Sequence, residues 1–440
     1  MDTSLLNRAL LDFLADSPNS YFAVHNMALR LGEASFTPLL ETDVWSLLPG
    51  HGYYVTRNGS SLIAFRVPDR MDFPGFQILA THCDSPTFRV KPNAELVVEN
   101  RYVRLNIERY GGMICSTWLD KPLSVAGRLL VRGSDGALRP VLVKVDRDLL
   151  VIPNLCIHFD RGVNEGRAWN IQTDLLPLFS GDPSQKLMDL VAGEAGVDPD
   201  TVEDCDLFLF NRMPGALFGA KNEFLGAGRL DDMQCVFASL TGFLSARPGP
   251  ACAIHCVFDN EEVGSMTRQG ASSTFLQDVL RRILFSLGRD EEGFQRAIAS
   301  SFMVSADDAQ ALHPNHIGKS DPVNRPVLNG GIVLKYNASQ KYATDGMSGA
   351  LFRSLCRRAD VPVQSFVNRS DIAGGSTLGN LSSAHVPLRT ADVGLPLLAM
   401  HSAWETGGAL DTGYLARAAE ELFSTALCIR PDGSFSFVSS

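Results

Sequence analysis

Apolar residues in the C-terminal half of the chain form continuous runs of strand length that alternate with stretches of helical periodicity. The runs at 252–258, 301–306 and 395–401 predict strands that are buried on both faces. The stretches at 233–246 and 412–429 carry apolar residues every three or four positions and predict helices. Strands that alternate with helices indicate βαβ units around a largely parallel sheet.

The beginning of the chain also has helical spacing, and Arg8, Asp12 and Asp16 interrupt its apolar positions. These charges argue against the hydrophobic segment of a signal peptide. An apolar run at 76–84 then predicts another buried strand. The chain has no stretch of about 18 apolar residues, so we expect no transmembrane helix and a soluble, cytoplasmic protein.

The segment 92–225 has a different pattern. Its short runs of strand-forming residues are separated by glycine and proline, which is typical of a β-rich unit. We therefore predict a discontinuous catalytic domain, residues 1–91 and 226–440, that is interrupted by a β-rich domain at 92–225.

Composition and charge exclude some classes of partner. Hydrophobic residues make up 45% of the chain and charged residues 20%, as in ordinary globular proteins. The net charge of -10 is spread along the chain without a cluster of Lys or Arg, so we expect no nucleic-acid partner. The nine cysteines form no CxxC pair, which favours free thiols in a reducing compartment.

Side chains of the kind that bind metals follow four of the predicted strands. They are His82, Glu261, Glu262, Asp307 and His401, and a glycine-containing turn before the helix at 233–246 adds Asp231. The carboxyl ends of strands in an open α/β sheet form the crevice that holds the site. We therefore expect these side chains to converge at one edge of the sheet.

Two imidazoles with several carboxylates suit zinc or another divalent transition metal. So many acids would repel one another without a cation, and two ions about 3.5–4 Å apart, bridged by one carboxylate, would offset that charge. Neighbouring side chains of an extended backbone point in opposite directions. One of the adjacent residues Glu261 and Glu262 can therefore bind metal while the other acts as a general base.

The structural alternative is that single acids at strand ends are helix caps or surface charges. The recurrence of metal-binding residue types at four strand ends favours a site instead. His255 lies inside the run 252–258 and is predicted to be a core histidine, whereas His313 and His316 are assigned to a loop. No Ser or Cys stands in a G-x-S-x-G setting, which argues against covalent catalysis.

Six stretches of the sequence resemble one known family, in order and over almost the full length. They are "THCDSPTFRVKP", "GRLDDM", "FDNEEVGS", "SADDAQALHPNH", "KYNASQKYATD" and "MHSAWE". All six are similar to motifs of the M18 aspartyl aminopeptidases. The resemblance implies a dinuclear zinc exopeptidase with a three-layer α/β/α catalytic domain and an inserted β-rich assembly domain. It also implies cytoplasmic homododecamers that remove N-terminal Asp or Glu from peptides.

The resemblance also implies roles for individual residues. The implied zinc ligands are His82, Asp231 as the bridging carboxylate, Glu262, Asp307 and His401. Glu261 resembles the general base, and Asp84 resembles the residue that orients His82. Asp308 has no expected ligand role.

Three further positions match segments that contact substrate or a neighbouring subunit in the family. Lys335 and Tyr342 are expected to contact substrate, and His158 is expected to reach the active site of an adjacent subunit. One position departs from the family pattern, because Trp404 stands where a basic residue is expected.

Two alternatives to an acid-specific aminopeptidase stay open. The same metal site could serve a broad or neutral-specificity aminopeptidase, or a non-catalytic metal-binding scaffold. Glu261 argues against a scaffold, because a pure binding site does not need a free carboxylate beside its ligands. Cobalt or manganese could replace zinc at such ligands.

Overall fold

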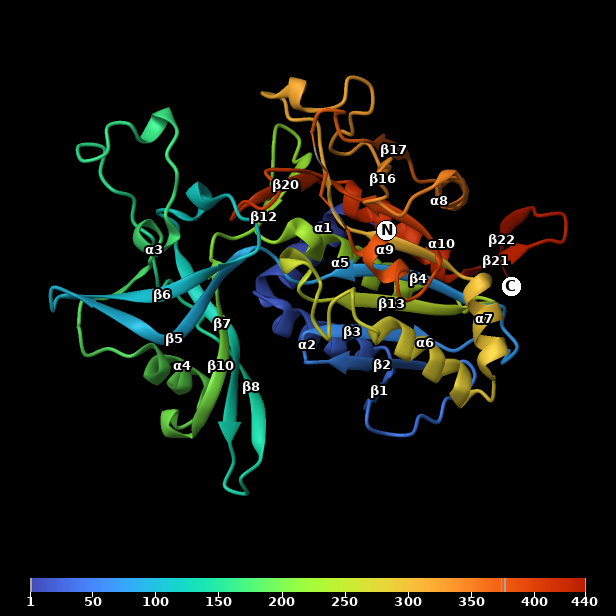
Figure 1. Ribbon diagram of the computed structural model, residues 1–440, viewed down its shortest axis with the longest axis horizontal. Helices are drawn as coiled ribbons and strands as arrows, with labels where there is room; N and C mark the ends of the chain where they lie inside the picture. The colour runs from blue at the N-terminus through green and yellow to red at the C-terminus, as the bar shows by residue number, and fades with distance from the viewer. Residues whose placement is uncertain (1, 373, 376, 440) are drawn as a thin grey trace.

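The computed structural model describes residues 2–372, 374–375 and 377–439. In this part of the chain, nine strands form a central sheet in the order β1-β2-β3-β13-β4-β14-β18-β16-β17 (Figure 1). The strands are β1 (Thr37–Leu39), β2 (Gly52–Arg57), β3 (Ser61–Arg66), β4 (Phe76–His82), β13 (Cys252–Phe258), β14 (Phe302–Ala306), β16 (Ile332–Lys335), β17 (Val363–Phe366) and β18 (Arg389–Gly394).

The middle of this sheet is parallel. Strand β4 pairs in parallel with β13 on one side and with β14 on the other, and β14 pairs in parallel with β18. All residues of β4, β13 and β14 are buried, which explains their uninterrupted apolar character. Their carboxyl ends meet at the same edge, where Phe258 of β13 pairs with His82 of β4.

Helices cover both faces of the sheet (Figure 1). One layer contains α1 (Thr3–Asp16), α2 (Ser20–Glu33), α5 (Leu230–Ser245), α8 (Gly346–Arg358) and α10 (Asp411–Phe423). The other contains α6 (Phe275–Ser286), α7 (Glu291–Ala299) and α9 (Leu378–Ser383). Alternate residues of β13 serve the two cores, Ala253 and Val257 on the α5 side and Ile254 and Cys256 on the α6 side. The predicted α/β class and three-layer α/β/α arrangement are confirmed.

A separate antiparallel sheet stands to the left of this body in Figure 1. Its described strands are β5 (Thr87–Val98), β6 (Tyr102–Tyr110), β7 (Leu123–Arg132), β8 (Leu138–Lys144), β9 (Leu178–Ser180) and β10 (Val202–Asn211). Helices α3 (Ile171–Asp174) and α4 (Leu187–Ala195) accompany it, and Phe88, Ile107 and Val191 belong to its own core. The predicted boundaries at 92 and 225 fall inside β5 and inside β12 (Phe224–Ala227), and the division into domains stays a prediction.

The run 395–401 does not form a strand of the central sheet, contrary to its prediction. Only β19 (Pro396–Leu398) is extended, and it belongs to a third sheet in the order β11-β12-β20-β19-β15. The remaining strands are β11 (Ala216–Phe218), β15 (Ala309–Gln310) and β20 (Glu405–Gly408). The central-sheet strand is β18, whose buried Thr390 and Asp392 interrupt its apolar pattern.

The helix predicted at 412–429 is also shorter than expected. Helix α10 ends at Phe423, and β21 (Thr425–Ile429) pairs with β22 (Phe435–Ser439) in a hairpin. The hydroxyls of Ser424 and Thr425 donate to the carbonyls of Glu420 and Glu421, and such bonds compete with helix continuation. No described helix combines the length and the apolar character needed to cross a membrane.

Phe243 tests the packing of the α5 layer. Its ring is fully buried, with ring centroids 5.4 Å from Phe36 and 5.1 Å from Phe423. We expect Phe243→Ala to lower the free energy of unfolding by about 3–5 kcal/mol, because it leaves a cavity. Phe285→Ala is the matched control, since Phe285 on α6 is 47% exposed, and its loss should be about 0.5 kcal/mol. Denaturant unfolding measures both, and equal losses would contradict this account of the core.

Candidate metal centre

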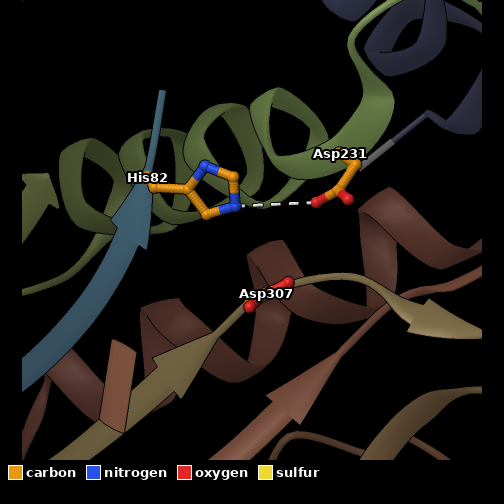
Figure 2. A group of neighbouring side chains, drawn as sticks. All are labelled: His82, Asp231 and Asp307. Carbon is orange, nitrogen blue, oxygen red and sulfur yellow. Dashed lines mark ion pairs between the residues drawn. The ribbon is translucent and has the colours of Figure 1, made fainter. Parts of the chain in front are cut away.

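The predicted ligands converge at the carboxyl edge of the central sheet. His82 ends β4, Asp307 directly follows β14, and Glu262 lies in a short 3-10 turn after β13. Asp231 lies at the start of α5, and His401 lies in the turn after β19. Figure 2 shows the ring of His82 turned toward the carboxylate of Asp231, with Asp307 beside them. Three strand ends of the central sheet therefore contribute, whereas His401 comes from the third sheet.

The ligand atoms form two groups that share Asp231. Within each group, His82–Asp231–Asp307 and Asp231–Glu262–His401, these atoms lie within 4.8 Å of one another. Oδ1 of Asp231 is 3.6 Å from Nε2 of His82, and Oδ2 of Asp231 is 3.3 Å from Nε2 of His401. Nε2 of His401 is also 3.4 Å from Oε2 of Glu262. The two oxygens of Asp231 thus face different histidines, as in a bridging carboxylate.

The donor set fits a divalent cation. Asp231 is only 3% exposed, and its Oδ1 and the buried Oε1 of Glu262 accept no hydrogen bond from any described residue. Burying a carboxylate oxygen without a partner is costly, and a metal ion would satisfy both atoms. Imidazole nitrogen combined with carboxylate oxygen is the ligand chemistry of zinc enzymes.

The electrostatics of the site also favour a bound divalent cation. Burial raises the pKa of Glu262 well above its ordinary value, and the Asp231 charge adds to this effect. Burial likewise raises the pKa of Asp307. Burial opposes the charge of His401, but Asp231 raises the pKa of that imidazole to about 9. The acids oppose one another's ionisation, and a divalent cation would relieve that repulsion.

Both histidines are oriented through Nδ1. That atom of His82 lies 3.0 Å from the backbone oxygen of Asp84 and 3.3 Å from its Oδ1. Nδ1 of His401 lies 2.8 Å from the backbone oxygen of Gly112. An acceptor at Nδ1 fixes the proton there and leaves Nε2 free to bind a metal. Both Nε2 atoms face Asp231.

Asp84 also fixes the turn that carries the two glutamates. It is 3% exposed, and its carboxylate accepts the backbone N–H of Glu261 at 3.0 Å and that of Glu262 at 3.1 Å. Ligand atoms of Glu261, Glu262 and His82 lie within 4.8 Å of one another. Burial raises the pKa of Glu261 to about 8. Glu261 is therefore next to the ligands and is held there by Asp84.

Sequence reasoning assigned no role to several residues that hold this site. Glu405 is 2% exposed and accepts the N–H of His401 at 2.7 Å and that of Asp231 at 3.1 Å. Asp232 accepts the N–H of His82 at 3.2 Å. Both lie in motifs that the sequence singled out, but only the fold shows which backbone groups they meet. Trp404 instead packs against Phe218 of the third sheet, at 5.7 Å between ring centroids.

A cavity of about 230 Å³ opens beside the ligands. Lys335 and Tyr342 line it, together with Glu261 and Asp307. The Lys335 ammonium donates to the backbone oxygen of Asp308 at 2.8 Å and lies 3.8 Å from Oδ1 of Asp307. His158 lies on an exposed turn of the inserted segment and is not among the described residues that line the cavity.

Comparison with known proteins identifies the family. A model of the family described as aminopeptidase I zinc metalloprotease (M18) matches residues 13–423. The chain belongs to the M18 family.

Individual M18 relatives match over nearly the whole chain. A probable M18 family aminopeptidase 2 of Clostridium acetobutylicum is 47% identical over 425 residues, or 95% of this chain and 98% of that protein. A probable M18 family aminopeptidase 2 of Pseudomonas aeruginosa is 40% identical over 96% of this chain and 98% of its own length.

Solved structures are similar to this chain over nearly its whole length as well. This chain matches a chain in the cryo-EM structure of the Ape4 and Nbr1 complex with a TM-score of 0.93 at 36% identity, covering 96% of this chain and 86% of that chain. It matches the S. cerevisiae mApe1 dodecamer with a TM-score of 0.84 at 27% identity, covering 95% and 96%. The M18 chain is a zinc-dependent aminopeptidase, which confirms the predicted family and enzyme class.

His401 offers a test of the ligand set. We expect His401→Ala to lose tightly bound zinc, because the group formed with Asp231 and Glu262 then lacks its imidazole nitrogen. The zinc content of the purified, dialysed protein measures this. His51→Ala is the control, since the His51 ring is exposed and its Nδ1 lies 2.9 Å from the backbone oxygen of Pro49, and the zinc content of this variant should be normal. Undiminished zinc in His401→Ala would remove His401 from the site.

Proposed function

We propose that this M18 aminopeptidase binds two zinc ions per subunit and removes acidic residues from the N-termini of peptides. The observation that carries the two-ion proposal is the position of Asp231, shared by two groups of ligand atoms. His82 and Asp307 are assigned to one ion, Glu262 and His401 to the other, and Asp231 to both. Cobalt or manganese could occupy the same ligands.

In the proposed reaction Glu261 is the general base. When bound, zinc supplies a lowered water pKa and a polarised scissile carbonyl. Glu261 accepts a proton from the water whose oxygen attacks the carbonyl carbon. As the C–N bond breaks, Glu261 returns that proton to the leaving amine. Asp84 supports this role, because it holds the backbone N–H of Glu261 and orients His82.

Lys335 supports the proposed preference for acidic residues. It is 3% exposed at the wall of the cavity, and although burial opposes its charge, Asp307 raises its pKa. Its ammonium lies 5.6 Å from the centre of the Tyr342 ring. A buried lysine that stays charged favours a carboxylate over an apolar side chain in the same pocket.

The alternative is a broad or neutral specificity. Phe366, Ile372 and Met400 also line the cavity, and they would suit apolar side chains. Asp307 already offsets part of the Lys335 charge, which weakens the preference for an acid. Cleavage rates over a panel of N-terminal residues separate the two specificities.

Assembly is the third part of the proposal. The mApe1 structure is a dodecamer, and we assign a homo-oligomer, a dodecamer by resemblance, to this cytoplasmic enzyme as well. Three exposed apolar side chains, Leu155, Ile157 and Phe159, lie within three residues of His158 along the chain. Such a surface suits a subunit contact, and His158 would then reach the active site of its neighbour.

Replacing Glu261 by Gln tests the general base. We expect kcat to fall about 10²–10⁴-fold, because the amide cannot accept the proton of the attacking water. Zinc content should persist, since the proposed ligands are unchanged. Steady-state kinetics and metal analysis on the same preparation measure both quantities. Near-normal kcat would assign the base to another residue.

Lys335→Met tests the acid preference, because it removes the charge and keeps an unbranched side chain that is one atom shorter. We expect kcat/KM to fall about 10- to 100-fold more for peptides with N-terminal Asp than for peptides with N-terminal Leu, because a charged hydrogen bond is lost. Paired measurements on the two peptides cancel any general damage to the site. An equal loss on both would exclude Lys335 as the residue that selects for acids.

A further inference from the structure

Tyr110 reaches the metal centre from the inserted sheet. It is the last residue of β6, and its hydroxyl donates to Oδ2 of Asp84 at 2.7 Å. The same hydroxyl accepts from Nδ2 of Asn260 at 2.8 Å. The ring packs edge-on against Phe208 of β10, at 5.7 Å between centroids. One side of this tyrosine therefore belongs to the insertion and the other to the site.

The hydrogen bond from Tyr110 is one of four contacts that the Asp84 carboxylate makes. Oδ1 of Asp84 accepts the N–H of Glu261 and faces His82, while Oδ2 accepts the N–H of Glu262 and the Tyr110 hydroxyl. Four contacts fix the plane of this buried carboxylate. Without the hydroxyl, Oδ2 keeps a single described partner, the N–H of Glu262, and the carboxylate is held against His82 by three contacts instead of four.

The contacts of Asn260 determine to which neighbour the Tyr110 hydroxyl donates its proton. Oδ1 of Asn260 accepts from the hydroxyl of Thr267 at 2.8 Å and from Nε2 of Gln269 at 2.9 Å. Since that oxygen is occupied by two donors, the Asn260 amide presents its NH₂ group to Tyr110. The tyrosine oxygen then acts as the acceptor from Asn260, so its proton points to Asp84.

The residues just after Tyr110 touch the other half of the site. The backbone oxygen of Gly112 receives Nδ1 of His401 at 2.8 Å. Gly111 has a φ of +76°, and a Cβ there would lie 3.1 Å from Cβ of Glu262. Gly111 and Gly112 therefore meet Glu262 and His401 of one group of proposed ligands, whereas Tyr110 reaches His82 of the other group only through Asp84.

We propose that Tyr110 is a positioning residue of the metal centre, acting through Asp84. It holds Asp84 so that His82 presents Nε2 to the metal and the turn with Glu261 and Glu262 keeps its place. The inserted sheet is then part of the catalytic apparatus, in addition to any role in assembly. This inference rests on the ligand set given under the proposed function.

Tyr110→Phe removes the hydroxyl and keeps the ring. We expect the zinc affinity of the protein, measured by competition with a chromogenic chelator, to fall about 10- to 100-fold. We also expect kcat at saturating zinc to fall while KM changes little, because Tyr110 does not line the cavity beside the ligands.

Tyr21→Phe is the matched control. The Tyr21 hydroxyl also donates to an aspartate, Oδ2 of Asp206 at 3.0 Å, but contacts no proposed ligand among the described residues. Its zinc affinity and kcat should equal those of the unmodified protein. If both variants lose zinc affinity equally, the effect is general loosening of the structure and the proposal fails.

A double-mutant cycle tests whether Tyr110 acts through Asp84. Asp84→Asn alone should weaken zinc binding, and Tyr110→Phe in that background should add little, because the hydroxyl no longer has its carboxylate to position. Additive losses would overturn the proposal. His82→Ala distinguishes a failure of the Tyr110 proposal from a failure of the ligand set. Unchanged zinc affinity in that variant contradicts the ligand set itself. Zinc loss in His82→Ala together with normal affinity in Tyr110→Phe contradicts only the role of Tyr110.

Discussion

The site depends on holding several carboxylates together in a buried place where they repel one another. Asp231, Glu262 and Asp307 lose hydration on burial, and each raises the cost of ionising its neighbours. Only a rigid frame keeps such groups close enough to share cations. The parallel middle of the central sheet supplies part of that frame, because β4, β13 and β14 end side by side. Bound cations would turn the repulsion into attraction, which makes metal binding and the shape of this edge interdependent.

A second set of acids fixes the backbone of the ligands. Asp232 holds the N–H of His82, Asp84 holds those of Glu261 and Glu262, and Glu405 holds those of Asp231 and His401. The N–H of Asp307 instead donates to Val393 of the neighbouring strand. Backbone groups have fewer rotational freedoms than side chains, so these bonds place each ligand from its main chain outward. Of the adjacent acids Asp231 and Asp232, the first is a proposed metal ligand and the second holds the backbone of another, His82.

The sequence allowed prediction of which side chains gather at this edge better than of the frame around them. His82, Glu262 and Asp307 follow apolar runs that are buried on both faces, and this pattern is visible without a structure. The strand predicted at 395–401 exists only as the short β19 and was wrongly placed in the central sheet, because the strand that lies there, β18, contains buried polar residues that interrupt its apolar pattern. Tyr110 could not be found, because β6 reads as an ordinary strand and the partner Asn260 lies 150 residues further along the chain.

The inserted sheet is tied to the site at three points of the chain. It begins at Thr87, three residues after Asp84, and the end of β6 returns to Asp84 through Tyr110. The end of β10 returns as well, where Nδ2 of Asn211 donates to the backbone oxygen of Ala403 at 2.8 Å. Ala403 lies two residues from His401, so the third tie reaches the opposite side of the centre. A displacement of this sheet would therefore move Asp84 and the His401 turn together, because both are hydrogen-bonded to the ends of its strands.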